Sequence, residues 1–470
     1  MSFYDRVSAE LARNFDVHDI GTRERIRLVA LENLGESFLD SKSLNVGFEK
    51  AYQQLIEESS VTCAKTSTEF PAIPSPDTAI FDIFASQMLA TVRLYSKKPV
   101  KVYGWMVCSA AAYQHLFGAV SPNKNNDLRS FIYEEAERSG KSIAEIVEQI
   151  YFTTTGEVLN IPGLPPIYDY ETAPQHMTVP QSDVGTLMIS GAEFIDGCDG
   201  VLIATPHAFE TPETLGGLAK RMDGNIHVVG PMLASGGDTH GAEKKQAAMA
   251  QEIDDFMGRI HEARGPRSLV YISFGTVWWS PEPEKIWTLL DVMMERKIPF
   301  VFSHGSPLAQ IPEDVRAKVE QSGLGLFSPW SPQQYILSHP VTGWFVTHCG
   351  YNSVLESIGA GVPMICWPFH ADQPTNAIHL TENLDIAYEL LEVRTGQGLK
   401  PIYRTGKAPT GTLDAVREEA HCVFEQAFGE DGEHKRSKIQ CLQESFADAW
   451  KEEGPADLAL QRFLESSAPS

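Results

Sequence analysis

Basic residues are scarce in this sequence. Its 470 residues include 38 lysines and arginines against 62 aspartates and glutamates, which gives a formal net charge of −24 at pH 7. A surface this acidic repels the phosphate backbone of nucleic acids and anionic lipid headgroups. The composition therefore argues against nucleic acid and bulk membrane as partners. Any phosphate group must be held by backbone amides, helix ends and a few local donors.

Long apolar runs and paired cysteines are also lacking. No uninterrupted apolar run approaches the roughly 20 residues that a transmembrane helix needs, and the early charges in MSFYDRVSAELARNFD do not fit a secretory signal peptide. The seven cysteines are scattered and never form a CxxC pair. That pattern excludes a disulfide framework and a cysteine zinc site. We expect a soluble cytoplasmic protein without a bound metal.

What the sequence does contain is an alternation of short apolar runs with amphipathic stretches, which is typical of α/β proteins. Its length suits two domains. A polar, glycine-rich stretch at 233–245 indicates the boundary, so we expect domains at 1–230 and 231–470. The predicted strands are 26–31, 79–81, 101–103, 200–204, 226–231, 268–274, 299–303, 344–347 and 362–367.

Helices are predicted between these strands. Ser280, Pro281 and Glu284 form a helix-start signal, and five apolar residues then recur at helical spacing: Ile286, Leu289, Leu290, Met293 and Met294. A second helix is expected at 353–358, and the insertion at 123–151 is predicted to be mostly helical.

One strand end carries a pattern suited to an anion. Thr347, His348 and Gly350 close the predicted strand 344–347, and the next helix begins near Asn352 and Ser353. The positive end of the helix dipole and its free amides attract an anion, and a glycine lets the backbone approach closely.

Further polar residues fall at the same sheet edge. Glu356 lies three residues after Ser353 and on the same helix face. Asp372 and Gln373 follow the strand 362–367. Open α/β sheets bind their ligands at the carboxyl ends of the strands, so these side chains predict a ligand site there.

The segment WSPQQYILSHPVTGWFVTHCGYNSVLESIGAGVPMICWPFHADQ, 330–373, resembles the UDP-sugar signature of family 1 glycosyltransferases. These enzymes have the GT-B fold, with two facing Rossmann-like domains. A signature of this length has a low false-positive risk. The resemblance implies that Trp330 stacks on uracil, Gln333 contacts the nucleoside, Gly350, His348, Asn352 and Ser353 hold the diphosphate, Glu356 binds the ribose, and Asp372 and Gln373 grip the sugar.

Other segments match the family in the same order. They are IPGLPP (161–166), GVLIATPHAFE (200–210), VVGP (228–231) and SFGT (273–276). The last resembles a second phosphate-side loop, which contains Gly275 and Thr276. Thr276 and Ser303 both end strands at the sheet edge, where they can contact phosphate or cap a helix.

The acceptor side matches less completely. Asp82, in AIFDIF, resembles the family's catalytic aspartate, but the histidine that this aspartate orients has no counterpart here. His18 lies in polar context without the family's Gly-His loop, and we assign it no role. The chain begins with a segment that resembles the one after the family's second strand. We therefore expect a first domain that lacks its first strand–helix–strand, with 26–31 as the family's third strand.

The resemblance implies an inverting transfer of a hexose from a UDP-sugar to a hydroxyl of a small lipophilic acceptor. The UDP-sugar is a co-substrate and no separate cofactor is expected. Gln373 favours UDP-glucose, although Tyr351 stands where plant members commonly have tryptophan. Two alternatives are a catalytically inactive UDP-sugar-binding relative and a truncated product. A dehydrogenase is disfavoured because no GxGxxG opens a helix after a strand, and an epimerase fits the Asp372–Gln373 ending less well.

Overall fold

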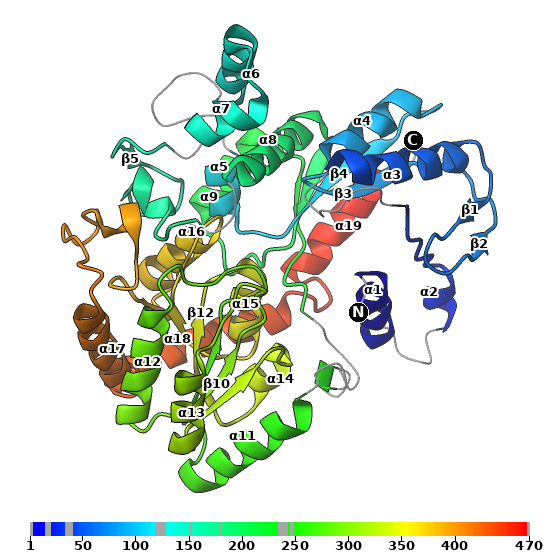
Figure 1. Ribbon diagram of the computed structural model, residues 1–470. Coiled ribbons are helices and arrows are strands. Elements are labelled where there is room, and N and C mark those ends of the chain that lie inside the picture. Colours follow the sequence, from blue (N-terminus) through cyan, green and yellow to red (C-terminus); the bar gives the residue numbers. More distant parts are fainter. Residues whose placement is uncertain are drawn as a thin grey trace.

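The computed structural model describes residues 3–14, 20–32, 41–117, 128–150, 153–177, 181–233, 243–244 and 249–467. It contains two parallel β-sheets, one from each half of the chain, with helices packed around them (Figure 1). Among these residues no helix combines the length and apolar character that crossing a membrane requires.

The second sheet has six parallel strands in the order β11-β10-β9-β12-β13-β14. The order runs outward from β9 in one direction and from β12 in the other, so the two halves of the sheet meet between these strands. That arrangement is the doubly wound order of a Rossmann-like domain. The strands are β9 (Leu269–Ser273), β10 (Phe300–Ser303), β11 (Gly325–Ser328), β12 (Thr342–Thr347), β13 (Met364–Cys366) and β14 (Ala387–Glu389).

Helices cover both faces of this sheet because its strands are apolar on both sides. Leu269 and Tyr271 of β9 pack into one core with Ile253 and Val354. The intervening residues of β9 pack into a second core on the opposite face, as alternating side chains must. The helices are α11 (Ala250–Arg264), α12 (Glu284–Glu295), α13 (Glu313–Ser322), α14 (Gln333–Ser338), α15 (Tyr351–Gly359), α16 (Gln373–Ile378), α17 (Leu413–Ala427) and α18 (Glu430–Asp448).

The first sheet has four parallel strands in the order β3-β4-β7-β8. They are β3 (Thr78–Asp82), β4 (Lys101–Met106), β7 (Gly200–Ile203) and β8 (Ile226–Val228). In the part of the chain that the structure describes, this sheet is therefore two strands smaller than the second one, and β3 forms its edge. Four of the predicted strands coincide with these elements, and the other four predictions within 268–367 are confirmed as strands of the second sheet.

One face of the first sheet packs against helices that precede and follow its strands. These include α3 (Ser41–Ile56), α4 (Ser86–Tyr95), α5 (Ala110–Leu116), α8 (Gln181–Gly197) and α9 (Pro212–Arg221). The last helix, α19 (Pro455–Ser467), covers the opposite face (Figure 1). Phe463 of α19 meets the Tyr103 ring edge to face, with 4.9 Å between centroids. The C-terminal helix α19 therefore links the second half of the chain to the first sheet.

Smaller elements complete the described chain. They are α1 (Phe3–Asn14), α2 (Ile20–Glu24), α6 (Leu128–Ser139), α7 (Ile143–Ile150), the pair β1 (Val61–Thr62) and β2 (Glu69–Phe70), the pair β5 (Val158–Leu159) and β6 (Ile167–Tyr168), η1 (Asp169–Thr172), η2 (His379–Asn383) and η3 (Gly396–Leu399). Helices α6 and α7 confirm a helical insertion where 123–151 is described.

Two local predictions are wrong. Residues 26–31 form no strand, because their backbone bonds run to Arg23 and Ala64 and no strand in the described chain lies alongside them. This segment is therefore not the strand, the family's third, that the resemblance implies. The helix-start signal is also displaced: α12 begins at Glu284, while the Ser280 hydroxyl accepts a hydrogen bond of 3.2 Å from the Glu282 amide in the preceding turn.

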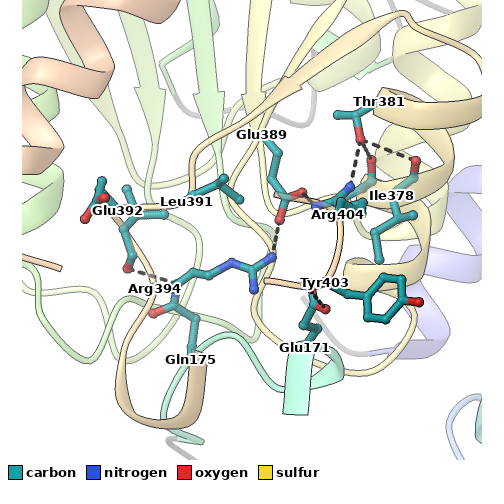
Figure 2. A network of polar contacts seen from close by, with 12 residues as sticks. Glu171, Gln175, Ile378, Thr381, Glu389, Leu391, Glu392, Arg394, Tyr403 and Arg404 are labelled. Atoms are coloured by element: carbon teal, nitrogen blue, oxygen red, sulfur yellow. Dashed lines mark hydrogen bonds and ion pairs between the residues drawn. The ribbon is translucent and has the colours of Figure 1, made fainter. Parts of the chain in front are cut away.

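A buried ionic cluster joins the two halves of the chain on one side. Figure 2 shows Glu389 between two arginines: it accepts 2.7 Å bonds from Arg394 and from Arg404. Glu171, from the segment between α7 and α8, reaches the same region and accepts a 2.9 Å bond from the Tyr403 amide. Burial alone would raise the pKa of Glu389, but the charges of Arg394 and Arg404 hold it below its ordinary value.

Replacing Glu389 with glutamine should strongly destabilise the protein. The substitution leaves the buried Arg394 guanidinium without its counter-charge and Arg404 with only the more exposed Glu382, and breaking such a buried pair costs about 3 kcal/mol or more. For a domain of this size that loss lowers the melting temperature by about 6–12 °C, measurable by differential scanning calorimetry. Glu295→Gln is the matched control, because Glu295 pairs with Arg417 at the exposed surface and should shift the melting temperature little. Equal shifts in the two variants would contradict this account.

Candidate functional site

The site is built on the carboxyl edge of the second sheet. Small polar residues end neighbouring strands in exact register there: Ser328, Ser303, Ser273 and Thr347 pair successively across the sheet. The last of these pairs joins β9 to β12, where the strand order reverses. Ligands of open α/β sheets bind at that point, and the predicted donor residues lie on the loops that leave it.

His348 occupies the centre of this edge. Its ring lies between two glycines, and a Cβ added to Gly275 would come within 2.8 Å of His348 Nε2. A Cβ on Gly350 would come within 3.0 Å of the ring carbon Cε1. Both glycines therefore provide the space that the imidazole fills. Burial lowers the pKa of His348 to about 4, against a smaller opposing effect of the Ser273 backbone, so the ring is neutral at pH 7.

The turn after His348 aims a helix at the same place. Cys349 adopts a left-handed conformation, with φ of +66°, and Gly350 then caps α15 without any side-chain hydrogen bond. Asn352 is exposed in the first turn, whereas Ser353 is buried. The N-terminus of α15, where the Tyr351 amide donates to Asp372, supplies further amides and the positive end of a helix dipole beside His348, an arrangement that suits a phosphate.

The predicted nucleoside residues lie on the loop after β11 and on α14. Trp330 is 43% exposed, and the guanidinium of Arg6 from α1 lies over its ring at 5.6 Å from the centroid. Gln333 donates from Nε2 to Ser353 Oγ at 3.0 Å and to Glu356 Oε2 at 2.6 Å. These contacts bring Gln333, Ser353 and Glu356 together, as the resemblance implies.

The predicted sugar residues begin α16. Asp372 Oδ2 accepts bonds from the Tyr351 amide at 3.1 Å and from Asn376 Nδ2 at 2.8 Å. Gln373 is only 2% exposed, and its Oε1 accepts a 2.9 Å bond from the Phe369 amide. The carbonyl end of Gln373 therefore holds its own loop, and its amide group is the end that remains for a ligand.

The two remaining predicted residues differ in exposure. Thr276 is exposed beside Gly275, while Ser303 is buried at the end of β10. The loop after β10 passes close to Thr276, since a Cβ added to Gly305 would lie 3.7 Å from Thr276 Cγ2. The structure thus brings Thr276 to the open side of the sheet edge and leaves Ser303 beneath it.

Asp82 lies at the carboxyl end of β3, in the first sheet. Its Oδ1 accepts a 3.0 Å bond from the Phe84 amide, and partial burial raises its pKa above the ordinary value of 3.8 although the side chain reaches solvent. Burial and the charges of Asp372, Glu210 and Asp82 raise the pKa of Cys108. The hydrogen bond between the Tyr351 hydroxyl and Thr205 joins the two sheet edges directly.

The family's catalytic aspartate is paired with a histidine, and the described residues show no such partner for Asp82. Within the described residues, no hydrogen bond joins Asp82 to a histidine, and His18 lies outside the described residues. In the described chain, Asp82 therefore lies at the edge of the first sheet and accepts a hydrogen bond from the Phe84 amide.

Sequence reasoning missed several residues of the site. Gln334 Nε2 donates to Glu356 Oε1 at 2.9 Å, so two neighbouring glutamines hold the same carboxylate. Asn376 follows Asp372 by four residues, and this spacing on a helix is the signal that could have found it. Ser109 Oγ donates to Asn376 Oδ1 at 3.1 Å from the other sheet, and no local pattern indicates that contact.

Ionisation of Asp372 should control the affinity for the sugar. Burial raises its pKa to about 6, so the carboxylate that is predicted to accept sugar hydroxyls forms as the pH rises from about 5 to 7. Hydrogen bonds to a charged group are stronger than those to a neutral one. UDP-glucose affinity should therefore rise about fivefold over this range, as measured by calorimetric titration. Asp372→Asn should remove the pH dependence, and an equal slope in both proteins would contradict the assignment.

Comparisons with known proteins agree on one family. The family model described as "UDP-glucoronosyl and UDP-glucosyl transferase" matches residues 227–395. UDP-glycosyltransferase eriJ of Hericium erinaceus is 33% identical over 406 residues, which cover 83% of this chain and 78% of the relative. The anthocyanidin 3-O-glucosyltransferase UFGT of Vitis vinifera is 38% identical over 165 residues, 33% of this chain and 36% of the relative.

Solved structures show the same fold. A glycosyltransferase from Siraitia grosvenorii in complex with UDP superposes with a TM-score of 0.65 at 19% identity, covering 94% of this chain and 90% of that one. UGT71G1 of Medicago truncatula, complexed with UDP-glucose, gives a TM-score of 0.65 at 18% identity, with 95% and 87% covered. The fold is GT-B, with two Rossmann-like domains.

Proposed function

This chain belongs to the UDP-glycosyltransferase family, and from that premise we propose that it transfers glucose from UDP-glucose to a hydroxyl of a small lipophilic acceptor. Membership of the family makes it a UDP-sugar-dependent glycosyltransferase. Beyond family membership, the proposal concerns three points: the identity of the sugar, the class of acceptor and the inversion at the anomeric carbon.

One observation carries the donor half of the proposal. The neutral ring of His348 fills the gap between Gly275 and Gly350, directly before the start of α15. A neutral imidazole donates a hydrogen bond to a diphosphate without burying a second charge, and the helix dipole stabilises the negative charge that grows as UDP leaves. The proposal needs no separate cofactor, because the UDP-sugar is itself a substrate.

The surrounding residues supply the other contacts. In the proposal the exposed face of Trp330 stacks on uracil, Gln333 contacts the nucleoside and Glu356 accepts hydrogen bonds from the ribose hydroxyls. Asn352, Ser353, Thr276 and Ser303 line the diphosphate. Asp372 and the free amide of Gln373 hold the sugar hydroxyls, and the preference for glucose rests on Gln373.

The acceptor half rests on Asp82. In the proposed reaction the acceptor hydroxyl gives its proton to the Asp82 carboxylate, and its oxygen forms a bond to the anomeric carbon. The bond between that carbon and the diphosphate oxygen breaks on the opposite face, and UDP leaves with the electron pair. We assign acceptor binding to residues 1–230 and donor binding to 231–470. All seven cysteines are free thiols, which supports a cytoplasmic setting.

A second function is favoured by the hydrogen bonding of Asp82. In the described chain this aspartate accepts from the Phe84 amide and from no histidine. A protein that binds a UDP-sugar without transferring it would have this arrangement.

A transfer assay separates the two functions. The chain is incubated with UDP-glucose and a panel of flavonoid and simple phenolic alcohols, with UDP-galactose and UDP-glucuronate as alternative donors. Release of UDP together with a glucosylated product supports the proposal. Product from another donor alone would overturn the choice of glucose. Tight UDP-glucose binding without product from any acceptor would favour the binding protein.

A further inference from the structure

Tyr351 connects the donor helix to the opposite domain. It is the first residue of α15 and is buried. Its backbone amide donates to Asp372 Oδ2 at 3.1 Å, while its hydroxyl donates to Thr205 Oγ1, on the loop that leaves β7. A single residue therefore touches the carboxylate proposed to hold the sugar and the edge of the first sheet.

The connection continues into the acceptor-side domain. Thr205 is fully buried, and its hydroxyl donates to Glu210 Oε1 at 2.7 Å. The same oxygen accepts a 2.9 Å bond from the Ala110 amide, at the start of α5. Thr214 donates to the other carboxylate oxygen at 3.1 Å. Glu210 therefore fixes the Thr205 loop to the N-terminus of α5.

A second path returns from α5 to the donor site. Ser109, which precedes Ala110 and caps α5, donates from Oγ to Asn376 Oδ1 at 3.1 Å. Asn376 donates from Nδ2 to Asp372 Oδ2 at 2.8 Å. Both paths begin at Asp372 Oδ2. One ends at Ala110, the first residue of α5, and the other ends at Ser109, its N-cap. Together they form a closed ring of hydrogen bonds between the domains.

Apolar packing holds the ring in place. The Phe209 ring meets Tyr351 edge to face, with 5.6 Å between centroids, and meets His379 at 4.7 Å. The Phe209 carbonyl also lies 2.6 Å from His379 Nε2. The hydroxyl of Tyr351 therefore has little freedom to find another partner, and interactions in such a buried network are strengthened by the low local dielectric.

We propose that Tyr351 is a positioning residue that fixes Asp372 relative to the acceptor-side helix α5 through its bond to Thr205. The proposal rests on the proposed function, because it concerns the alignment of the sugar with the acceptor. Tryptophan at this position has no hydroxyl to donate to Thr205, so the tether belongs to the tyrosine of this chain. Misplacement of a reacting group by about 1 Å can slow a reaction a hundredfold.

The kinetic test uses variants that remove or retain the hydrogen bond. Tyr351→Phe and Thr205→Val should each lower kcat about tenfold with the KM for UDP-glucose and the Kd for UDP within about twofold. Thr205→Ser keeps the hydroxyl and should restore most of kcat. The double variant Tyr351→Phe/Thr205→Val should be no slower than Thr205→Val alone, since Thr205→Val already removes the bond to Tyr351 together with the bond from Thr205 to Glu210. Tyr388→Phe, which removes a hydroxyl bound to Asp431, is the control and should retain wild-type kinetics.

Three results would overturn the proposal: wild-type kcat in Tyr351→Phe, failure of Thr205→Ser to exceed Thr205→Val, or multiplicative losses in the double variant. Failure of the proposed function is recognised separately, as absence of transfer by the wild-type chain. The tether is then tested by hydrogen–deuterium exchange with UDP. UDP should slow exchange of the α5 amides in the wild type and not in Tyr351→Phe, although both bind UDP. Equal protection in both would contradict the tether.

Discussion

Replacing Asp82 with asparagine should lower the rate of glycosyl transfer by about 10²–10⁴-fold, the usual contribution of a general base or its partner. Asparagine keeps the size of the side chain and can still accept a hydrogen bond from the Phe84 amide, which the aspartate now accepts at 3.0 Å. It cannot take up a proton, so the acceptor hydroxyl loses its route of deprotonation. Initial rates with UDP-glucose and the best acceptor provide the measurement.

The affinity for UDP distinguishes this effect from misfolding. Asp82 lies on the first sheet, whereas the proposed UDP contacts lie on the second, so the Kd for UDP should be unchanged. Asp77→Asn is the matched control, because Asp77 precedes the same strand at its opposite end and pairs with Lys98 at the exposed surface. A normal rate in Asp82→Asn, or an equal loss in Asp77→Asn, would remove Asp82 from the mechanism.

Gly350→Ala should weaken UDP binding by about tenfold to a hundredfold. The added methyl group would overlap the His348 ring, whose Cε1 would lie 3.0 Å away. Gly350 has a φ of −59°, so alanine meets no backbone strain there and the collision alone is responsible. Overpacking of this kind costs about 1–3 kcal/mol, and it displaces the ring that is proposed to contact the diphosphate.

The control for this variant is Gly258→Ala on α11. Outside its chain neighbours and the backbone of α11 itself, no atom of the described chain lies within 4 Å of the position where its Cβ would be, and alanine favours the helix. Gly258→Ala should bind UDP as the wild type does and melt at the same or a higher temperature. Calorimetric titration measures both affinities. Unchanged UDP affinity in Gly350→Ala would show that the His348 pocket is not part of the binding site.

Much of the second domain follows from local sequence pattern. The run SLVYISF predicts a buried strand because apolar residues face both sides, and β9 packs into a core on each face. Polar residues that end successive strands then share one edge, which is why Thr276, Ser303 and Thr347 are predicted at one sheet edge before the register of β9, β10 and β12 is known. The positions of His348 and Asp372 follow from the same geometry.

The wrong and missing predictions have a common physical cause, which is dependence on distant partners. Residues 26–31 have the composition of a strand, but a strand needs a neighbour to pair with and the described chain offers none there. The bond between Tyr351 and Thr205 joins residues 146 positions apart, so no local pattern indicates it. The signature assigns Gln373 to the sugar, but it contains no information on the loop amides that donate hydrogen bonds to the Gln373 side-chain carbonyl.

The central claim is that the second sheet edge binds UDP through His348, and calorimetric titration of UDP into the wild-type chain and His348→Ala tests it most directly. The wild type should bind at one saturable site. His348→Ala, which removes a ring packed between Gly275 and Gly350, should bind about tenfold more weakly while its circular dichroism spectrum stays unchanged. Absence of binding by the folded wild-type chain, or equal affinity in the two proteins, would contradict the account.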